Sequence, residues 1–257
     1  MIARAAPLET SEDAVLGGRL TLRQPLRGHR VGHDAMLLAA ATAAHAGERA
    51  IDLGAGVGAA GLALARRVDG LAVTLVEIDP ALTQLAQDNA DRNGLASAVR
   101  AVCIDVGAPA AAFAAAGLEK EGADRVLMNP PFNALQNSSP EPGRRTAHAA
   151  PRGTLQQWTR TASRLLRADG VLTLIWRADG LDEVLAELAF GFGAVSLLPV
   201  HPKPDAPAIR VLARATKGSR APLALLPGLV LADATGKPTE TAESVLRHGG
   251  VLPLADI

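Results

Sequence analysis

Hydrophobic and polar positions alternate along most of the chain in the order strand, turn, helix. From residue 49 onward, short runs rich in Val, Leu and Ile are each followed by a longer segment with apolar residues at helical spacing. The short runs predict strands at Ala50–Leu53, Ala72–Ile78, Val99–Ile104, Arg125–Met128 and Val171–Trp176. The longer segments predict helices at Ala60–Val68, Pro80–Asn93, Pro109–Ala116, Thr154–Leu166 and Leu181–Ala189. This alternation is typical of an α/β fold with a parallel sheet and helices on both faces.

The pattern changes after the fifth helix. Ala194–Val200 and Ile209–Ala215 are strand-like runs joined by a proline-rich loop with no room for a helix, so they predict an antiparallel hairpin. With the five parallel strands they predict a mostly parallel, seven-stranded sheet.

Segments of a different pattern flank this core. We expect an N-terminal extension over residues 1–48, with a short strand at Gly18–Pro25 and a helix at Asp34–Ala46. The Rossmann-like core then covers 49–218. Residues 219–257 form a C-terminal extension packed on the core, with one short helical run near Thr241–Arg247.

Composition narrows the functional classes. The chain carries 26 basic and 26 acidic residues, which argues against a protein held to nucleic acid by bulk electrostatic attraction but does not exclude a local basic patch. The single cysteine, Cys103, has no partner for a disulfide and favours a reducing, cytoplasmic compartment. No segment predicts a secretion signal or a membrane span, and the histidines lack metal-ligand spacing, so we expect no membrane association and no metal.

A glycine-rich turn follows the first core strand. The sequence Ile-Asp-Leu-Gly-Ala-Gly-Val-Gly begins at Ile51, and its Asp52, Gly54, Gly56 and Gly58 are candidate cofactor-binding residues. Glycine lets the backbone turn sharply and approach a ligand closely at the start of a helix. Such a turn suits NAD, FAD or S-adenosylmethionine, and it also occurs as a tight turn without a ligand.

Two acidic residues stand at the ends of the next two strands. Glu77 ends the second strand, where a carboxylate can accept both ribose hydroxyls of a nucleoside cofactor. Asp105 follows the third strand and can accept a hydrogen bond from an adenine amine. The alternatives are a solvated cap for Glu77 and a loop or cap residue for Asp105.

The fourth strand leads into Asn129-Pro130-Pro131-Phe132. An amine conjugated to a ring is a poor nucleophile because its lone pair is delocalised. The Asn129 side-chain oxygen and the Pro130 carbonyl can each accept one N–H bond and favour a pyramidal nitrogen. The two prolines stiffen the loop, and Phe132 can stack on a planar target. The alternative is an ordinary Pro-Pro loop with a buried Phe.

This tetrapeptide resembles the signature of S-adenosylmethionine-dependent methyltransferases that act on planar amines. The resemblance implies the class I methyltransferase fold, S-adenosylmethionine as cofactor, catalytic roles for the residues of the tetrapeptide, and a place for Asn129 beside the cofactor. Residues Gln24-Pro25 and the segment 28–39 resemble the N-terminal motif of bacterial adenine-N6 methyltransferases that modify valine tRNA beside the anticodon. That family implies that Asp34 and its neighbours close over the methionine part of the cofactor.

The resemblance extends to basic segments and shows departures. His29 stands where many relatives have an aromatic residue, and no second aromatic follows Phe132. Two groups of cations are candidates for contacting RNA phosphates, with a solvated surface as the alternative: Arg144, Arg145 and Arg152 after the tetrapeptide, and Arg210, Arg214, Lys217 and Arg220 near the hairpin.

Methylation of adenine in RNA, most of all tRNA, is therefore the expected function. The alternatives are methylation of a glutamine side chain in a release factor, methylation of guanine N2 in RNA, and a binding module without catalysis. A resemblance to the release-factor enzymes would imply a helical domain of roughly 70–80 residues before the glycine-rich strand. In this sequence about 48 residues precede that strand. The sequence does not predict an oligomeric state.

Overall fold

The computed structural model describes residues 9–27, 30–132 and 153–255. Its central sheet has nine strands: β3 (Arg49–Leu53), β4 (Ala72–Glu77), β5 (Val99–Cys103), β6 (Ala123–Met128), β7 (Leu166–Arg177), β8 (Phe192–His201), β9 (Arg210–Lys217), β10 (Ala224–Leu225) and β11 (Leu229–Val230). The helices are α1 (His33–Ala41), α2 (Ala59–Arg67), α3 (Pro80–Arg92), α4 (Ala110–Ala115), α5 (Thr154–Leu165), α6 (Leu181–Leu188) and α7 (Glu240–His248).

The strand order is β10-β8-β9-β7-β6-β3-β4-β5, with β11 also paired to β8. Strands β3 to β7 are parallel, and β9 runs antiparallel to both β7 and β8. All seven predicted core strands are present, including the antiparallel hairpin. The sheet has nine strands because β10 and β11 add parallel to β8. Each of these is two residues long, too short to produce a periodic sequence pattern.

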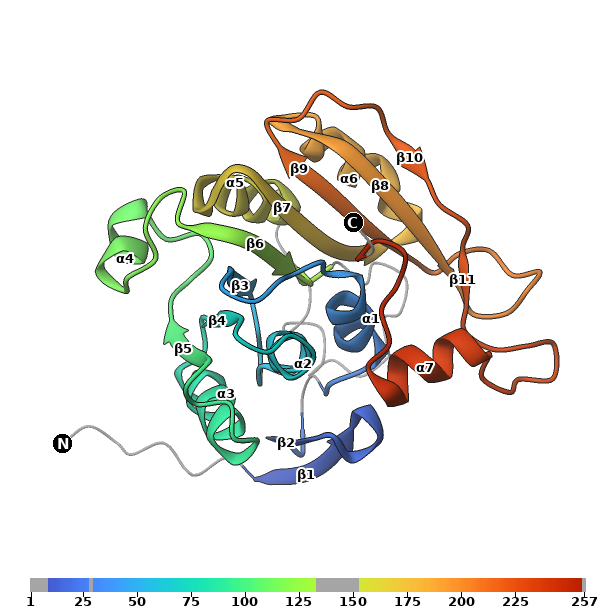
Figure 1. Cartoon of the computed structure of the whole chain (residues 1–257), viewed down its shortest axis with the longest axis horizontal. Coiled ribbons are helices and arrows are strands. Elements are labelled where there is room, and N and C mark those ends of the chain that lie inside the picture. The colour runs from blue at the N-terminus through green and yellow to red at the C-terminus, as the bar shows by residue number, and fades with distance from the viewer. Residues whose placement is uncertain (1–8, 28–29, 133–152, 256–257) are drawn as a thin grey trace, which may run out of the picture.

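Helices cover both faces of the sheet, as the alternation predicted. Figure 1 shows α4, α5 and α6 on one side and α1, α2 and α3 on the other. Each face buries its own apolar cluster. One is built around Leu37, Leu62 and Leu75, and the other around Phe113, Val126 and Leu172. The first includes Leu16 and Leu254, so residues from both terminal segments share the core.

The N-terminal segment differs from its predicted form in two places. The predicted strand is β2 (Leu20–Pro25), and it pairs with a strand that the sequence did not predict, β1 (Thr10–Val15). The predicted helix ends at Ala41, not Ala46. The Thr42 hydroxyl donates to the Leu38 carbonyl, and Arg67 of α2 donates to the carbonyls of Ala39 and Thr42. These bonds satisfy the carbonyl groups at the helix end.

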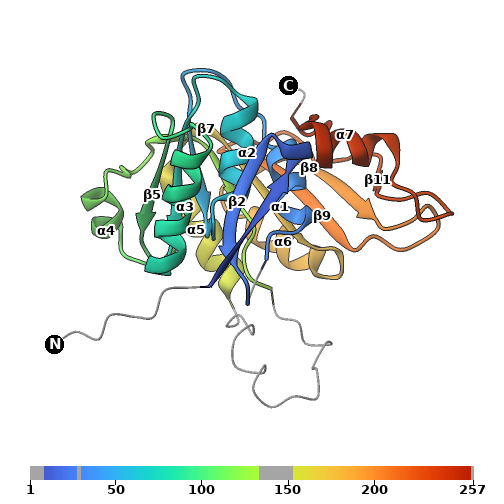
Figure 2. The ribbon, with the colours of Figure 1, turned by 90° about the horizontal axis from the view of Figure 1, so that it is seen from below.

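Two asparagines, one in α3 and one at its C-cap, bind the free edge of β2. Asn89 accepts from the Arg23 amide (2.7 Å) and donates to the Arg23 carbonyl (3.0 Å). Asn93 makes the same pair of bonds with Thr21 (2.9 and 2.8 Å). Asn89 also donates to the carbonyl of Val57 in the glycine-rich turn. One buried side chain therefore joins the hairpin, α3 and this turn, and the view in Figure 2 shows β2 in front of α2 and α1.

The C-terminal segment packs beside the N-terminal one. Helix α7 contacts α1 and the 3-10 turn Leu16–Gly18, and the predicted run Thr241–Arg247 lies within it. The amide of Leu252 donates to the Ala40 carbonyl of α1. None of the helices in the described ranges is long and apolar enough to cross a membrane.

Candidate active site

The glycine-rich turn connects β3 to α2 at the carboxyl edge of the parallel strands. All three glycines have positive φ angles: 68° at Gly54, 57° at Gly56 and 89° at Gly58. A Cβ on Gly54 would lie 2.1 Å from the Trp158 ring, and one on Gly58 would lie 2.8 Å from Leu75. At Gly56, no atom from elsewhere in the described part of the chain lies within 4 Å of the corresponding position. The turn is thus packed on one side and open at Gly56, which suits close approach of a ligand.

Asp52 is buried and faces helix α2, away from the open side of the turn at Gly56. Its side chain is 2% exposed, and one carboxylate oxygen accepts from the Gly61 amide in the first turn of α2 at 2.8 Å. Burial, reinforced by the nearby carboxylate of Glu77, raises the pKa of Asp52 to about 7. The structure gives Asp52 a role in holding α2, and a direct cofactor contact remains a prediction.

Glu77 ends β4 next to the turn. One carboxylate oxygen accepts from the Gly56 amide (2.8 Å), and the other accepts from the amides of Ile78 and Asp79 (2.9 Å each). Glu77 is therefore a junction between two loops, not the solvated cap of the alternative interpretation. A carboxylate has about four acceptor positions, so these three bonds leave roughly one for a ligand. Asp79 is the N-cap of α3, accepting from the amides of Ala81 and Leu82.

The loop after β5 is more open. Asp105 is exposed and accepts from the Gly107 amide at 2.8 Å, as a residue that stabilises a turn would. Ile78 is 61% exposed, which is unusual for an isoleucine next to a buried carboxylate. Among the described residues, no group of His, Cys, Asp or Glu side chains converges as a metal site.

Asn129, Pro130, Pro131 and Phe132 follow β6, the strand that pairs directly with β3. The two loops thus meet where the strand order reverses direction, which is where open α/β sheets bind ligands. The Asn129 Oδ1 atom is buried and has no hydrogen-bond partner among the described residues. A buried acceptor without a donor is costly, so this atom is suited to an N–H donor of a ligand.

Phe132 is held by two side chains from other strands. The Trp176 ring at the end of β7 packs edge-on against it, with 5.8 Å between centroids and 79° between planes. The Arg210 guanidinium lies 4.9 Å from the Phe132 centroid. Its Nε donates to the Asp34 carboxylate of α1 at 2.9 Å. Asp34 is therefore linked to the tetrapeptide indirectly: it binds Arg210, and Arg210 contacts Phe132.

The predicted RNA-binding cations that the structure describes do not form one patch. Arg144, Arg145 and Arg152 lie outside the described residues. Arg214 donates to the Leu254 carbonyl, and burial lowers its pKa; Lys217 donates to Glu121 and to the Leu166 carbonyl. Because β9 crosses the sheet, Lys217 and the exposed Arg220 lie at the edge opposite Arg210.

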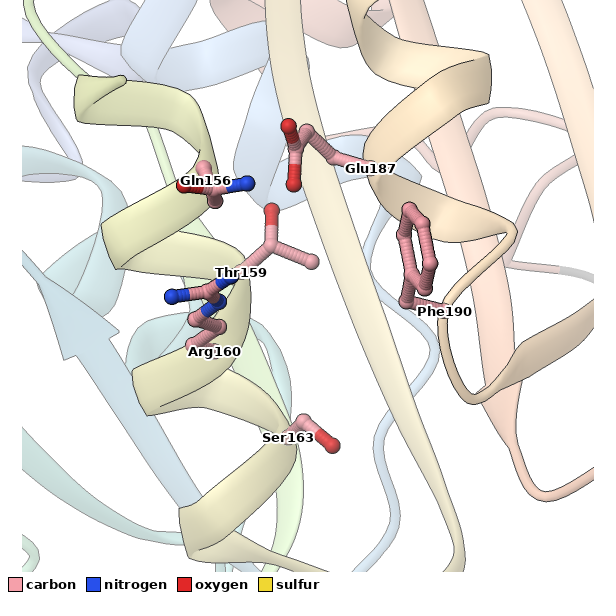
Figure 3. Close-up of a pocket in the computed structure, with 6 residues that line it drawn as sticks. All are labelled: Gln156, Thr159, Arg160, Ser163, Glu187 and Phe190. Atoms are coloured by element: carbon pink, nitrogen blue, oxygen red, sulfur yellow. The ribbon is translucent and has the colours of Figure 1, made fainter.

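A cavity of about 250 Å³ lies elsewhere, between α5 and α6 (Figure 3). It is lined by Gln156, Thr159, Arg160, Ser163, Glu187 and Phe190, none of which the sequence singled out. The glycine-rich turn and the tetrapeptide contribute nothing to its lining, so it is separate from the candidate active site.

Sequence reasoning missed three site residues. Trp158 closes the packed side of the turn at Gly54, and Trp176 supports Phe132. Ile78 offers an apolar surface beside Glu77. The signal available for the tryptophans was their rarity, because they are the chain's only two.

Comparisons with known proteins agree with this geometry. A family model described as methyltransferase small domain matches residues 29–198. A Bacteroides fragilis protein named tRNA1(Val) (adenine(37)-N6)-methyltransferase is 29% identical over 187 residues, 71% of this chain and 75% of the relative. A Chlorobaculum tepidum release factor glutamine methyltransferase is 31% identical over 60% of this chain and 54% of its own.

A solved structure is also similar. The crystal structure of a predicted O-methyltransferase from Agrobacterium tumefaciens matches with a TM-score of 0.72 and 31% identity, covering 85% of this chain and 98% of the other. The strand order, the glycine-rich turn and these matches all indicate a methyltransferase. The chain therefore belongs to the methyltransferase small domain family, with the class I methyltransferase fold, and it is an S-adenosylmethionine-dependent methyltransferase.

Proposed function

We propose that this enzyme methylates the exocyclic amine of an adenine in RNA, with tRNA as the preferred substrate. The observation that carries the proposal is the buried Oδ1 of Asn129, which has no hydrogen-bond partner among the described residues and belongs to the same tetrapeptide as Phe132. S-adenosylmethionine supplies an electrophilic methyl group when bound. The open side of the turn at Gly56, Glu77 and the apolar surface of Ile78 are suited to its nucleoside part.

The residues of the tetrapeptide orient the amine. Asn129 Oδ1 accepts one N–H of the amine and the Pro130 carbonyl accepts the other, which favours a pyramidal nitrogen. Phe132 stacks on the ring that carries the amine. No strong base is needed, because the attacking nitrogen is neutral and its proton becomes acidic only after transfer. Alignment and hydrogen bonding then provide most of the rate enhancement, on the order of 7–11 kcal/mol when the geometry is good.

The same arrangement favours nitrogen over oxygen as the acceptor atom, although one similar structure is named a predicted O-methyltransferase. A hydroxyl must lose its proton as it attacks. The tetrapeptide offers acceptor oxygens and no ionisable side chain. An amine that donates two N–H bonds matches this set, whereas a hydroxyl donates only one.

A glutamine side chain also carries a planar amine, and the release-factor relative makes it the second candidate. The N-terminal segment supports RNA instead. Residues 10–25 form a hairpin and residues 33–41 form a helix on the core, and this part of the sequence carries the motif that resembles the tRNA enzymes. The tRNA-modifying relative from Bacteroides fragilis also shares more of the chain than the release-factor relative, 71% against 60%.

The test is methyl transfer from labelled cofactor to unmodified tRNA and to purified release factor, followed by mass spectrometry of the nucleosides. N6-methyladenosine is the expected product. Label confined to the release factor would establish the second candidate, and N2-methylguanosine would move the target to guanine. Label in neither substrate would refute both proposed acceptors.

A further inference from the structure

The side chain of Arg210 joins three segments that are far apart in the sequence. Arg210 is the first residue of β9, and the reversed direction of this strand places it at the carboxyl edge of the parallel strands. Its Nε donates to Asp34, 176 residues earlier, and its Nη1 donates to the neighbouring Ile209 carbonyl at 3.0 Å. The ion pair is about three-quarters buried, with Arg210 and Asp34 exposed by 26% and 27%.

The guanidinium is held over the ring of Phe132. At 4.9 Å from the centroid, it lies within the range in which a cation is attracted to an aromatic face. The Trp176 ring lies nearly perpendicular to the Phe132 ring. A cation and a second aromatic ring therefore both fix the orientation of Phe132.

We propose that Arg210, held by Asp34, is a positioning residue that orients the Phe132 ring to receive the planar group to be methylated. This inference rests on the proposed function and deepens it. Phe132 follows a loop with two prolines, so its ring has no helix or strand of its own to fix it. An isolated surface ion pair contributes little, but here it fixes the plane of a guanidinium above a ring.

This role differs from a contact between Arg210 and an RNA phosphate. A phosphate contact acts independently of Phe132. Each such contact changes the slope of log K for RNA binding against log salt concentration by about 0.7–0.9. A positioning role acts through Phe132. It leaves the salt slope unchanged and disappears when the ring is removed.

The kinetic test compares Arg210→Ala, Arg210→Lys, Phe132→Ala and the double variant Arg210→Ala/Phe132→Ala. Arg210→Ala should raise the KM for RNA by about 10-fold, while kcat and the cofactor Kd change by less than about 2-fold. Arg210→Lys, which keeps a cation, should recover part of the loss. In the Phe132→Ala background, Arg210→Ala should have no further effect. Additive losses together with a smaller salt slope would overturn the proposal in favour of a phosphate contact.

A second readout does not depend on activity. The chain has four phenylalanines, so incorporation of fluorophenylalanine gives a small set of ¹⁹F resonances, and Phe132→Leu identifies the one from position 132. In the protein without RNA, Arg210→Ala and Asp34→Asn should each shift or broaden this resonance and leave the other three in place. Arg247→Ala, which removes an exposed cation from α7, is the matched control and should move none.

The two readouts separate the possible failures. An unmoved Phe132 resonance in Arg210→Ala would overturn the positioning role whatever the substrate. A shifted resonance in an enzyme that transfers no methyl group to RNA would refute the proposed function and leave the positioning role in place.

Discussion

Asn129 presents a buried acceptor atom at the carboxyl end of β6, and the proposed chemistry depends on it. Asn129→Ala should lower the turnover number by about 100-fold or more, because the lost hydrogen bond strengthens in the transition state. The cofactor Kd should stay near the wild-type value. Single-turnover kinetics and calorimetry check the two halves of this prediction. Near-normal turnover would show that Asn129 does not activate the amine.

Glu77 is predicted to bind the ribose of the cofactor, and it already accepts hydrogen bonds from three backbone amides. Glu77→Ala should weaken cofactor binding by about 1.5–3 kcal/mol, the scale of hydrogen bonds to a charged group. Part of this loss will come from disorder of the two loops that Glu77 joins. Calorimetry with the cofactor product measures the loss, and an unchanged affinity would remove Glu77 from the site.

Asp52 makes the stability of the protein depend on pH. Its pKa is about 7 in the folded state against 3.8 for the ordinary group. Between these values the folded state binds more protons than the unfolded state, so the free energy of unfolding falls as pH rises from about 4 to about 7. Asparagine keeps an acceptor for the Gly61 amide and does not ionise. Asp52→Asn should therefore remove this slope and be more stable than the wild type at pH 8, by about 4 kcal/mol at most.

Urea unfolding of both proteins at several pH values between 4 and 8 checks the prediction for Asp52. The difference between the two free energies of unfolding isolates Asp52 from the other titrating groups. A difference that does not change with pH would contradict the raised pKa.

At the scale of elements, the side chains of Asn89 and Asn93 make the hydrogen bonds to β2 that a third strand of the hairpin sheet would otherwise make. A free strand edge exposes unpaired backbone groups, and these side chains cover the edge of β2 at Thr21 and Arg23. Asn89→Ala should lower the free energy of unfolding by about 3 kcal/mol, because it leaves three backbone groups without their partner.

Hydrogen exchange locates the effect of this substitution. In Asn89→Ala the Arg23 amide should exchange faster, while the Thr21 amide stays protected by Asn93. Gln84→Ala, which breaks an exposed bond to Asp88 on the same helix, is the control and should change neither amide. Equal protection of Arg23 in the variant and the wild type would contradict the role of Asn89.

The elements also show what the sequence can predict. Apolar periodicity predicted the seven longer strands of the central sheet and the five helices between them, because these elements bury one face or both. It missed β1, whose sequence Thr-Ser-Glu-Asp-Ala-Val lacks buried alternate positions. It placed the end of α1 too late, because Arg67 of α2 binds the carbonyls there. The contact of Arg210 with Asp34 and Phe132 depends on tertiary structure and has no local sequence signal.

The whole molecule carries no formal net charge, because 26 basic residues balance 26 acidic ones. Of the cations predicted to contact RNA, Arg210, Arg214 and Lys217 already bind groups of the protein. Affinity for duplex DNA should therefore be weak, with a Kd of roughly 1 μM or above at physiological salt, and it should fall further as salt rises. Fluorescence anisotropy at two salt concentrations measures both quantities. A tight complex that resists salt would show a binding surface that these residues do not explain.

The reversed direction of β9 also has a consequence for how the enzyme is made. A chain emerges from the ribosome N-terminus first, so Asp34, the glycine-rich turn and Asn129 all appear before Arg210. At roughly 5–20 residues per second, the 176 residues between Asp34 and its partner take on the order of 10–35 s to synthesise. Through that interval Asp34, in the first turn of α1, lacks its ion-pair partner on β9. The glycine-rich turn can fold early, whereas the contact of Arg210 with Phe132 forms only near the end of translation.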